Sequence, residues 1–379
     1  MWKAIHIYYY QDDKEGLLLD GIRPVVKSLR DTYQVERIYL KRHWKLGPHI
    51  ILYVDALEER FEKVLYPFIE QEIYKYLKEH PSTQVIDPVA YVKQSETLGA
   101  WELEPGPYEP LEPDNSISVK PVRSRAELVN GEEVAHLIEN FMVDSVDLVF
   151  DCLDSTRGQI NQRYGKLIQM MAVIGQMYPV DGIIRGHLSY RSHVEGYLHS
   201  FDKEGKIRQV FLENERGMMK TVDHLVRDIM DHTNEDGTYG GDDPFLQSWS
   251  EVLSKLYQEA FPLAQAGKIN ADTSHYREIA ARIGEQAKKR WDLTQDQSDF
   301  HRHLQSEEEG LRVLNSPEFA TYRILVNNFY SLLPLLGINP NVKHLLCFLV
   351  ANSVERIAQV TWQELMGYQK GENTYETKT

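Results

Sequence analysis

The alternation of apolar and polar residues predicts that the chain opens with a small α+β unit. Residues 2–10 alternate and are rich in aromatic side chains, and residues 35–40 and 49–54 alternate or are apolar, so all three ranges are expected to form strands. Residues 17–29 and 57–76 carry apolar side chains at the three- and four-residue spacing of amphipathic helices. The order βαββα predicts a ferredoxin-like unit with an antiparallel hairpin in its sheet.

The rest of the chain is predicted to be mainly helical. Helical periodicity covers residues 132–154, 158–177, 317–333 and 342–359, and residues 207–213 are expected to form a short strand. These patterns indicate an α+β fold in which the helical part is larger than the sheet unit.

Composition suggests where the parts of the chain divide. Residues 101–114 are rich in proline and glutamate, which predicts an extended crossing loop. We expect a βαββα antiparallel-sheet unit over residues 1–100 and a mainly helical catalytic part over residues 101–370, either separate from the first unit or continuous with it. The last residues, 371–379, are expected to form a disordered tail.

Charge and composition narrow the classes of partner. The chain has 379 residues and a formal net charge of −15, which argues against nucleic acid or an anionic membrane as the main partner. It has no signal-peptide pattern and no apolar run near the roughly 20 residues that span a bilayer. Cys152 and Cys347 lie in apolar stretches without metal-binding spacing, so we expect reduced core residues in a cytoplasmic protein.

A segment near the middle of the chain has the most unusual composition. Residues 186–198 combine polar, aromatic and imidazole side chains between apolar flanks, which is typical of a pocket that binds a polar substrate and moves protons. The competing interpretation is a polar edge of a strand or helix. The expected catalytic residues, which we expect to line one pocket, are Ser189, Tyr190, Arg191 and His193. The expected substrate-binding neighbours are His187 and Glu195.

A second candidate lies in the hairpin between the second and third expected strands. Packing alone explains Trp44, but Arg42, His43, Lys45 and His49 gather beside a tight turn and form a local basic cluster on an otherwise acidic chain. Such a cluster suggests anion or amide binding, and we expect these five residues to bind substrate in a groove near the sheet unit.

Two further patterns lie toward the C-terminus. Asn352 and Glu355 fall on an otherwise apolar helix face, where they are either satisfied core groups or pocket-lining, substrate-binding residues. His301 and His303 have no third ligand at a persuasive spacing, so a solvated helix face is expected there rather than a metal site. Because the chain also lacks nucleotide- and metal-binding motifs, we expect neither a metal nor an organic cofactor.

Several landmarks taken together resemble the C-terminal (elimination) domain family of the class I lantibiotic dehydratases, which is also the family of stand-alone thiopeptide-type bacteriocin biosynthesis proteins. The ordered set comprises Arg23-Pro24, residues 42–44, 47–49, 141–145 and 186–198, and the terminal helix. It spans most of the chain. The resemblance implies an elimination-domain-like fold.

The chain departs from the pattern of family members that eliminate glutamate from glutamylated serine or threonine. Such members usually have arginines two and four residues after the hairpin histidine, where this chain has Ile51 and Tyr53. They also usually carry an Arg-Tyr-Gly-Gly element that residues 119–125 lack. An eliminase needs cations to hold the leaving glutamate and a base for the α-proton. His344 could match the family's late histidine, but it does not restore the arginine pair.

The branch with this departure looks like the thiopeptide pyridine synthases, and residues 327–355 are also more similar to this branch. The resemblance implies a formal [4+2] aza-cycloaddition that joins two dehydroalanines of a modified precursor peptide. Water and the leader peptide are then lost, and a pyridine macrocycle forms. Its substrate would be a leader joined to a dehydroalanine-containing core. The hairpin groove would then contact the leader peptide, and other maturation enzymes are possible partners.

Two other functions remain open from the sequence. One is a glutamate eliminase that recruits His344 and Arg191. The other is a non-catalytic, leader-binding partner of a dehydratase complex. For the cycloaddition, Ser189, Tyr190, Arg191 and His193 would supply hydrogen-bond donors and a near-neutral base.

Overall fold

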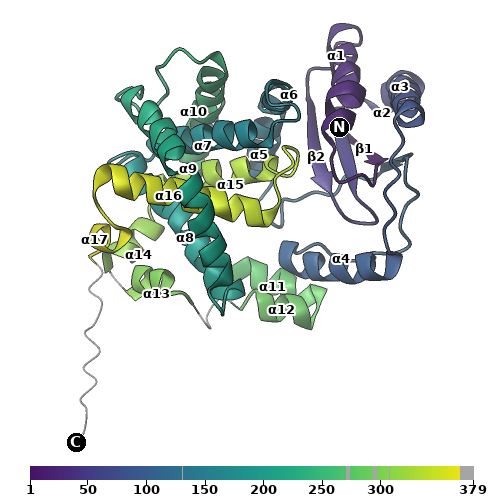
Figure 1. Ribbon diagram of the computed structural model, residues 1–379. Helices are drawn as coiled ribbons and strands as arrows, with labels where there is room; N and C mark the ends of the chain where they lie inside the picture. Colours follow the sequence, from purple (N-terminus) through teal and green to yellow (C-terminus); the bar gives the residue numbers. More distant parts are fainter. Residues whose placement is uncertain (130, 270–273, 293–296, 307, 368–379) are drawn as a thin grey trace, which may run out of the picture.

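The computed structural model describes residues 1–129, 131–269, 274–292, 297–306 and 308–367. A small antiparallel sheet with its helices lies beside a larger helical part, and both are built largely as the sequence patterns predict (Figure 1). The expected disordered tail, 371–379, lies outside the described residues.

The sheet has four strands, all antiparallel, in the order β2-β3-β1-β4. This is the strand order of a complete ferredoxin-like βαββαβ unit. The strands are β1 (Trp2–Tyr8), β2 (Ile38–His43), β3 (His49–Asp55) and β4 (Ser116–Lys120). The helices of this unit are η1 (Leu17–Ile22), α1 (Arg23–Asp31), α2 (Glu58–Arg60), η2 (Phe61–Leu65) and α3 (Tyr66–Glu79).

The two faces of the sheet differ in chemistry because successive side chains of a strand point to opposite sides. On β3, Ile50, Leu52 and Val54 are fully buried in the main core, together with residues of η1, α1 and α3. The alternate positions, such as Ile51 and Tyr53, point to the other face, and Tyr53 lines a cavity together with residues of the helical part. The sheet therefore offers a polar and aromatic wall to the helical part.

The fourth strand was not expected. β4 pairs with β1 but lies outside the range 1–100 that the sequence suggested for the sheet unit, so the sheet extends to Lys120. The strand is short and follows a proline-rich stretch, and Pro121 comes directly after it. A five-residue strand between prolines carries too little alternation to be recognised locally, and pairing with β1 decides its conformation.

The helical part is organised around α7 and α16, whose side chains are mostly buried. Its long helices are α5 (Glu132–Asp144), α6 (Val146–Ser155), α7 (Ile160–Gln176), α8 (Ile183–Phe201), α9 (Lys206–Asp231), α10 (Pro244–Gln265), α15 (Pro317–Leu332) and α16 (Pro340–Ala358). The shorter helices are α11 (Ser274–Ile283), α12 (Glu285–Arg290), α13 (Asp299–Ser306), α14 (Glu308–Leu314) and α17 (Trp362–Leu365).

The strand expected over residues 207–213 was wrong, because these residues begin the long helix α9. The local run of β-branched and aromatic side chains favours a strand. Over the whole helix, however, Phe211, Val222, Val226 and Ile229 are buried on one side at helical spacing. Tertiary packing of that stripe overrides the local preference.

A second, smaller apolar cluster joins the sheet unit to the helical part. Helix α4 (Pro88–Glu102) contributes Ala100 and packs against Ile279, Ala280 and Ala287 of α11 and α12. Trp291 Nε1 donates a hydrogen bond of 3.1 Å to the carbonyl of Ala100. In Figure 1 these three helices lie together below the sheet and the main helical bundle.

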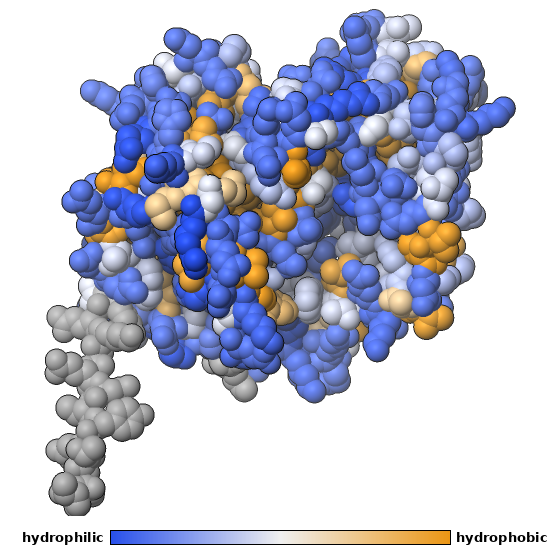
Figure 2. All heavy atoms as spheres, viewed as in Figure 1, coloured by the Kyte–Doolittle hydropathy of each residue, from blue (hydrophilic) through white to orange (hydrophobic). Residues whose placement is uncertain are grey.

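The surface is mainly polar, and the two cysteines lie in the buried core. Hydrophilic residues dominate the face drawn in Figure 2, and hydrophobic residues form only small patches there. No helix within the described residues has the length and apolar character needed to cross a membrane. Cys152 and Cys347 are free thiols and both are buried, as expected.

Candidate active site

The unusual segment 186–198 lies within helix α8. The helix places Ser189 and His193 one turn apart on one side, and it directs Tyr190 and Arg191 elsewhere. Tyr190 is fully buried, and its hydroxyl donates a hydrogen bond of 2.7 Å to the carbonyl of Met171. The expectation that all four side chains line one pocket was therefore wrong, because helical periodicity separates them.

Arg191 belongs to a buried polar network that ties α8 to α16 and α9. Its Nη2 lies 2.9 Å from Glu355 Oε1 and 2.5 Å from Asn352 Oδ1. The Nδ2 of Asn352 donates in turn to Glu215 at 3.0 Å, and His187 Nε2 lies 3.5 Å from Glu355. Burial alone would raise the pKa of Glu355, but the neighbouring His187 ring and the charge of Arg191 keep it below its ordinary value.

Glu195 extends this network toward the surface. Its carboxylate lies 3.7 Å from Arg191 Nη1 and 3.0 Å from Arg208 Nη2. The five residues expected at a pocket from these two helices, His187, Arg191, Glu195, Asn352 and Glu355, are thus brought together, but as partners of one another. The sequence left two alternatives open for Asn352 and Glu355. This arrangement fits the first, in which they are core groups with satisfied hydrogen bonds.

The other side of α8 meets α15 and α16 through His193. Its ring packs edge-on against the ring of Tyr330, with centroids 4.9 Å apart. Lys343 Nζ lies 4.9 Å from the centroid of the same tyrosine ring, and the Tyr330 hydroxyl is 3.2 Å from Cys347 Sγ. Burial lowers the pKa of His193 well below its ordinary value, and the charges of Lys343 and His344 act in the same direction. His193 is therefore a neutral imidazole at neutral pH.

His344, the possible match to the family's late histidine, lies close to this group but is held by its own contacts. Its ring stacks on Tyr197 with centroids 4.0 Å apart, and its Nδ1 is 2.6 Å from the carbonyl of Pro340. Burial and the charge of Lys343 lower its pKa to about 3. Tyr330 and Lys343 were not singled out from the sequence, because a tyrosine and a lysine on amphipathic helices carry no local signal of function.

A cavity of about 290 Å³ separates the polar face of the sheet from α5 and α15. Residues of β2, β3, the segment after β4, α5, α11 and α15 line it. Its polar and aromatic lining includes Tyr39, Lys41, Tyr53, Arg123, Arg125, Glu139, His275, Tyr276, Arg323, Asn327, Asn328 and Ser331. On a chain with an excess of acidic residues, this hollow gathers cations and aromatic rings.

Helix α15 connects the cavity to His193. Arg323 and Asn327 line the cavity, and Tyr330, which contacts His193, follows on the same side of the helix at a spacing of three to four residues. The charge of Arg323 also contributes to lowering the pKa of His193, after burial and nearer charges. We take the cavity together with the pair His193–Tyr330 as the candidate active site. Sequence reasoning selected His193, whose catalytic role stays a prediction, and missed the cavity, which only the packing of distant segments creates.

The hairpin residues expected to contact a peptide are occupied by internal contacts. Arg42 Nη2 donates to the carbonyl of Asp12 at 3.0 Å, and its Nη1 lies 3.4 Å from the carbonyl of Pro334 after α15. Lys45 Nζ lies 3.0 Å from Glu104 Oε1 and 2.6 Å from the carbonyl of Pro105. Both side chains thus have polar partners within the chain, carbonyl oxygens for Arg42 and a carboxylate for Lys45, and a role in peptide binding stays a prediction.

The aromatic and imidazole groups of the same hairpin pack against the sheet. Trp44 Nε1 donates to Glu102 at 2.9 Å, and His49 is almost fully buried, with its Nε2 2.9 Å from His6 Nδ1. His43 lies beside His49, with ring centroids 5.5 Å apart. Burial lowers the pKa of His43 to about 4 and that of His6 to about 3, so these rings are neutral at neutral pH.

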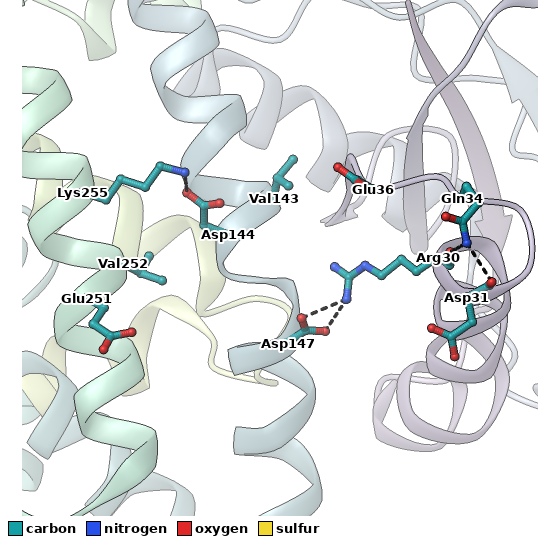
Figure 3. A pocket seen from close by; sticks show the side chains of 10 residues that line it. All are labelled: Arg30, Asp31, Gln34, Glu36, Val143, Asp144, Asp147, Glu251, Val252 and Lys255. Atoms are coloured by element: carbon teal, nitrogen blue, oxygen red, sulfur yellow. Dashed lines mark hydrogen bonds and ion pairs between the residues drawn. The ribbon is translucent and has the colours of Figure 1, made fainter.

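Another hollow on the surface lies away from these groups. A groove of about 850 Å³ runs between the end of α1 and helices α5, α6 and α10 (Figure 3). Arg30 bonds both oxygens of Asp147 at 2.7 and 2.9 Å, and Lys255 bonds Asp144 at 2.6 Å. None of the expected site residues lines this groove, and its ion pairs join α1 to α6 and α10 to α5.

The histidines considered as a metal pair are partly buried rather than solvated. His301 lies between two serines, with Ser192 Oγ 2.9 Å from its Nε2 and Ser298 Oγ 2.7 Å from its Nδ1. His303 Nε2 lies 2.8 Å from the carbonyl of Met366. Across the parts of the chain that the structure describes, no group of three or more His, Cys, Asp or Glu side chains is arranged to hold a metal ion.

Comparison with known proteins shows which of them have a similar fold and sequence. Two solved structures share the fold. A pyridine synthase, TbtD, from thiomuracin biosynthesis has a TM-score of 0.72 and 23% sequence identity, and the match covers 94% of this chain and 99% of that one. The structure of TsrL has a TM-score of 0.68 and 16% identity, with 98% and 99% of the two chains covered. No match was found among curated protein sequences. The family model described as "Lantibiotic biosynthesis dehydratase C-term" matches residues 2–351, so the chain belongs to that family.

Proposed function

We propose that this protein is a maturation enzyme for a thiopeptide, one class of ribosomally synthesised and post-translationally modified peptide, and that it catalyses a formal [4+2] aza-cycloaddition between two dehydroalanines of a precursor. Water and the leader peptide are then lost and a pyridine macrocycle results. The observation that carries the proposal is the sheet face beside the cavity. Ile51 and Tyr53 stand on this face at the positions where glutamate-eliminating members of the family are expected to carry arginines, and Tyr53 lines the cavity.

The cavity suits a reaction that depends on holding two parts of one peptide together. Well-oriented intramolecular reactions reach effective molarities worth about 7–11 kcal/mol, so positioning supplies most of the acceleration. The rings of Tyr39 and Tyr53 stack with centroids 4.3 Å apart and form a flat aromatic wall. Planar conjugated groups of a dehydrated peptide would pack against such a wall.

The reaction also needs groups that hold one backbone amide as its iminol tautomer. A donor and an acceptor must meet the same peptide unit. Asn327 and Ser331 on α15 line the cavity and offer both. We assign the neutral imidazole of His193, which contacts Tyr330 on the helix that lines the cavity, to accept or return a proton. Ser189, on the same side of α8, is assigned a supporting hydrogen bond.

Glutamate elimination is the second candidate, and one observation favours it. Lys41, Arg125 and Arg323 line the cavity, so cations are present although the expected arginine pair is not. Such cations could hold the carboxylates of a leaving glutamate. Elimination therefore has to be tested beside cycloaddition.

The decisive experiment offers the purified protein two peptides in parallel. One carries a leader and two dehydroalanines, and the other carries the same leader and a glutamylated serine. The proposal expects the first peptide to give a pyridine chromophore and a shortened leader, and the second to be unchanged. Loss of glutamate from the second peptide would favour the eliminase. Tight binding of both peptides without any turnover would favour a leader-binding partner of a dehydratase complex.

A further inference from the structure

Three cations that line the cavity, Lys41, Arg125 and Arg323, have no ion pair within the described residues, and Lys41 is the lysine among them, whose amine can release a proton near neutral pH. Lys41 lies on β2 and its side chain lines the cavity. Within the described residues its ammonium group has no ion pair, whereas Arg123 pairs with Glu104 at 2.8 Å and Lys268 pairs with Glu133. An unpaired and largely dehydrated ammonium is costly, so its retention needs an explanation other than stability.

Aromatic and apolar groups surround Lys41 in place of a counter-ion. Its Nζ lies 5.5 Å from the ring centroid of Tyr39 and 5.7 Å from that of Tyr53. Ile51 is its partner on the neighbouring strand. The two tyrosine rings hold the amine over the cavity by cation–π attraction without fixing it to a carboxylate.

Burial, with a smaller contribution from neighbouring charges, brings the protonation equilibrium of Lys41 into the neutral range. Burial lowers its pKa to about 7; Arg125 adds to this effect, and Glu139 opposes it. The titratable and charged groups that share the cavity with it are Tyr39, Tyr53, Arg123, Arg125, Glu139, Lys268, His275, Tyr276 and Arg323. Near neutral pH the amine therefore exists in both forms, which is the condition for an efficient proton donor and acceptor.

We propose that Lys41 is the catalytic proton donor for the loss of water that follows ring closure, an inference that rests on the proposed cycloaddition. After ring closure the former amide carbon carries a hydroxyl group. The Lys41 ammonium gives a proton to that hydroxyl as the carbon–oxygen bond breaks, and water leaves. The ring nitrogen becomes doubly bonded to the same carbon, and the earlier carbon–nitrogen double bond becomes a carbon–carbon double bond. The proton released by the ring methylene returns to the amine and restores the ammonium, so the step is redox-neutral.

The test compares Lys41→Met, which cannot carry a proton, with Lys41→Arg, which keeps the charge but does not release a proton near neutral pH. Lys63→Met on exposed η2 is the matched control, since that lysine is 71% exposed. Using the full chain and the bis-dehydroalanine peptide, both Lys41 variants should lower kcat by about 10²–10⁴-fold, while KM changes less than about threefold. They should also accumulate a cyclised species with the mass of the substrate, because ring closure alone loses no atoms.

The pH profile and a direct titration separate this inference from the proposed function. The wild-type rate should fall as pH rises through about 7, where Lys41 loses its proton, and this inflection should be missing in Lys41→Met. A carbon-13 titration of the lysine side chains, assigned with the same variant, should show Lys41 near neutral. Pyridine formation by wild type with full turnover by Lys41→Met, or titration of Lys41 near 10.5, overturns the inference and leaves the proposed function standing. Absence of the pyridine product from wild type contradicts the proposed function itself.

Discussion

Arg191 and Lys41 are two cations withdrawn from water, and their surroundings are opposite. Arg191 is surrounded by the carboxylates of Glu355 and Glu195 and by the amide of Asn352. Lys41 is surrounded by two tyrosine rings and faces a cavity. The first charge is satisfied within the fold and holds three helices together, whereas the second is left for something outside the fold to satisfy.

The difference teaches where to look for chemistry in this molecule. The sequence drew attention to the dense polar segment of α8. The charged side chains of such a helix surface can, however, all pair with other residues of the same protein. The sheet face drew little attention, although it presents unpartnered polar groups to a hollow. An unpaired group beside a cavity is a stronger sign of function than a crowded but satisfied one.

Helix α8 carries both Arg191, whose charge is satisfied within the fold, and His193, which we assign to the active site. The variant with the largest expected effect tests the role of His193. His193→Ala should lower kcat with the bis-dehydroalanine peptide by about 10²–10⁴-fold, which corresponds to roughly 3–5 kcal/mol of barrier. The exposed His224→Ala on α9 serves as control. Steady-state kinetics by mass spectrometry, with peptide affinity measured in parallel, checks the result. Full turnover by His193→Ala would remove that residue from the site.

Breaking the satisfied cluster should affect stability. Arg191→Met leaves Glu355 buried without its cation, and we expect the free energy of unfolding to fall by about 3–5 kcal/mol. Arg185→Met on the same helix breaks an exposed pair with Asp181 and should cost less than about 1 kcal/mol. Urea denaturation of both variants makes the comparison, and equal stabilities would contradict a structural role for the Arg191 network.

The neutral histidines of the sheet face predict that stability depends on pH. His6 and His43 have folded-state pKa values of about 3 and 4, below the 6.5 of the unfolded chain, because burial disfavours their charged forms. As pH falls below 6.5 the unfolded state takes up protons that the folded state does not, so stability decreases. Between about pH 7 and 5 each histidine should cost about 1–2 kcal/mol. His43→Gln should flatten the curve measured by thermal unfolding, and an unchanged slope would argue against a neutral His43.

The smallest expected effect concerns the hairpin residue Lys45, which already has an ion pair. Lys45→Ala removes a partly exposed ion pair with Glu104, and leader affinity should change by less than about 1 kcal/mol. Titration of a labelled leader peptide at low salt tests this. A much larger loss would show that Lys45 leaves Glu104 to bind the peptide.

The sequence allowed the sheet unit to be predicted better than the active site. Strands β1, β2 and β3 and the helices between them follow from local periodicity, because one face of each must be buried. β4 could not be predicted in the same way, since its conformation depends on pairing with β1. The cavity was invisible for a related reason: Lys41, Arg125 and Arg323 are far apart in the chain and meet only through packing. His193 could be selected by composition, but whether its side of α8 met a cavity depended on the helical period.

The most direct test of the proposed function follows one nitrogen atom. A precursor peptide is labelled with nitrogen-15 at the dehydroalanine whose amide is to leave with the leader, and the products are separated and weighed after incubation with wild-type protein. The account predicts an unlabelled pyridine macrocycle and a labelled leader ending in a carboxamide. Label retained in the core peptide, or a leader that stays attached, would contradict it.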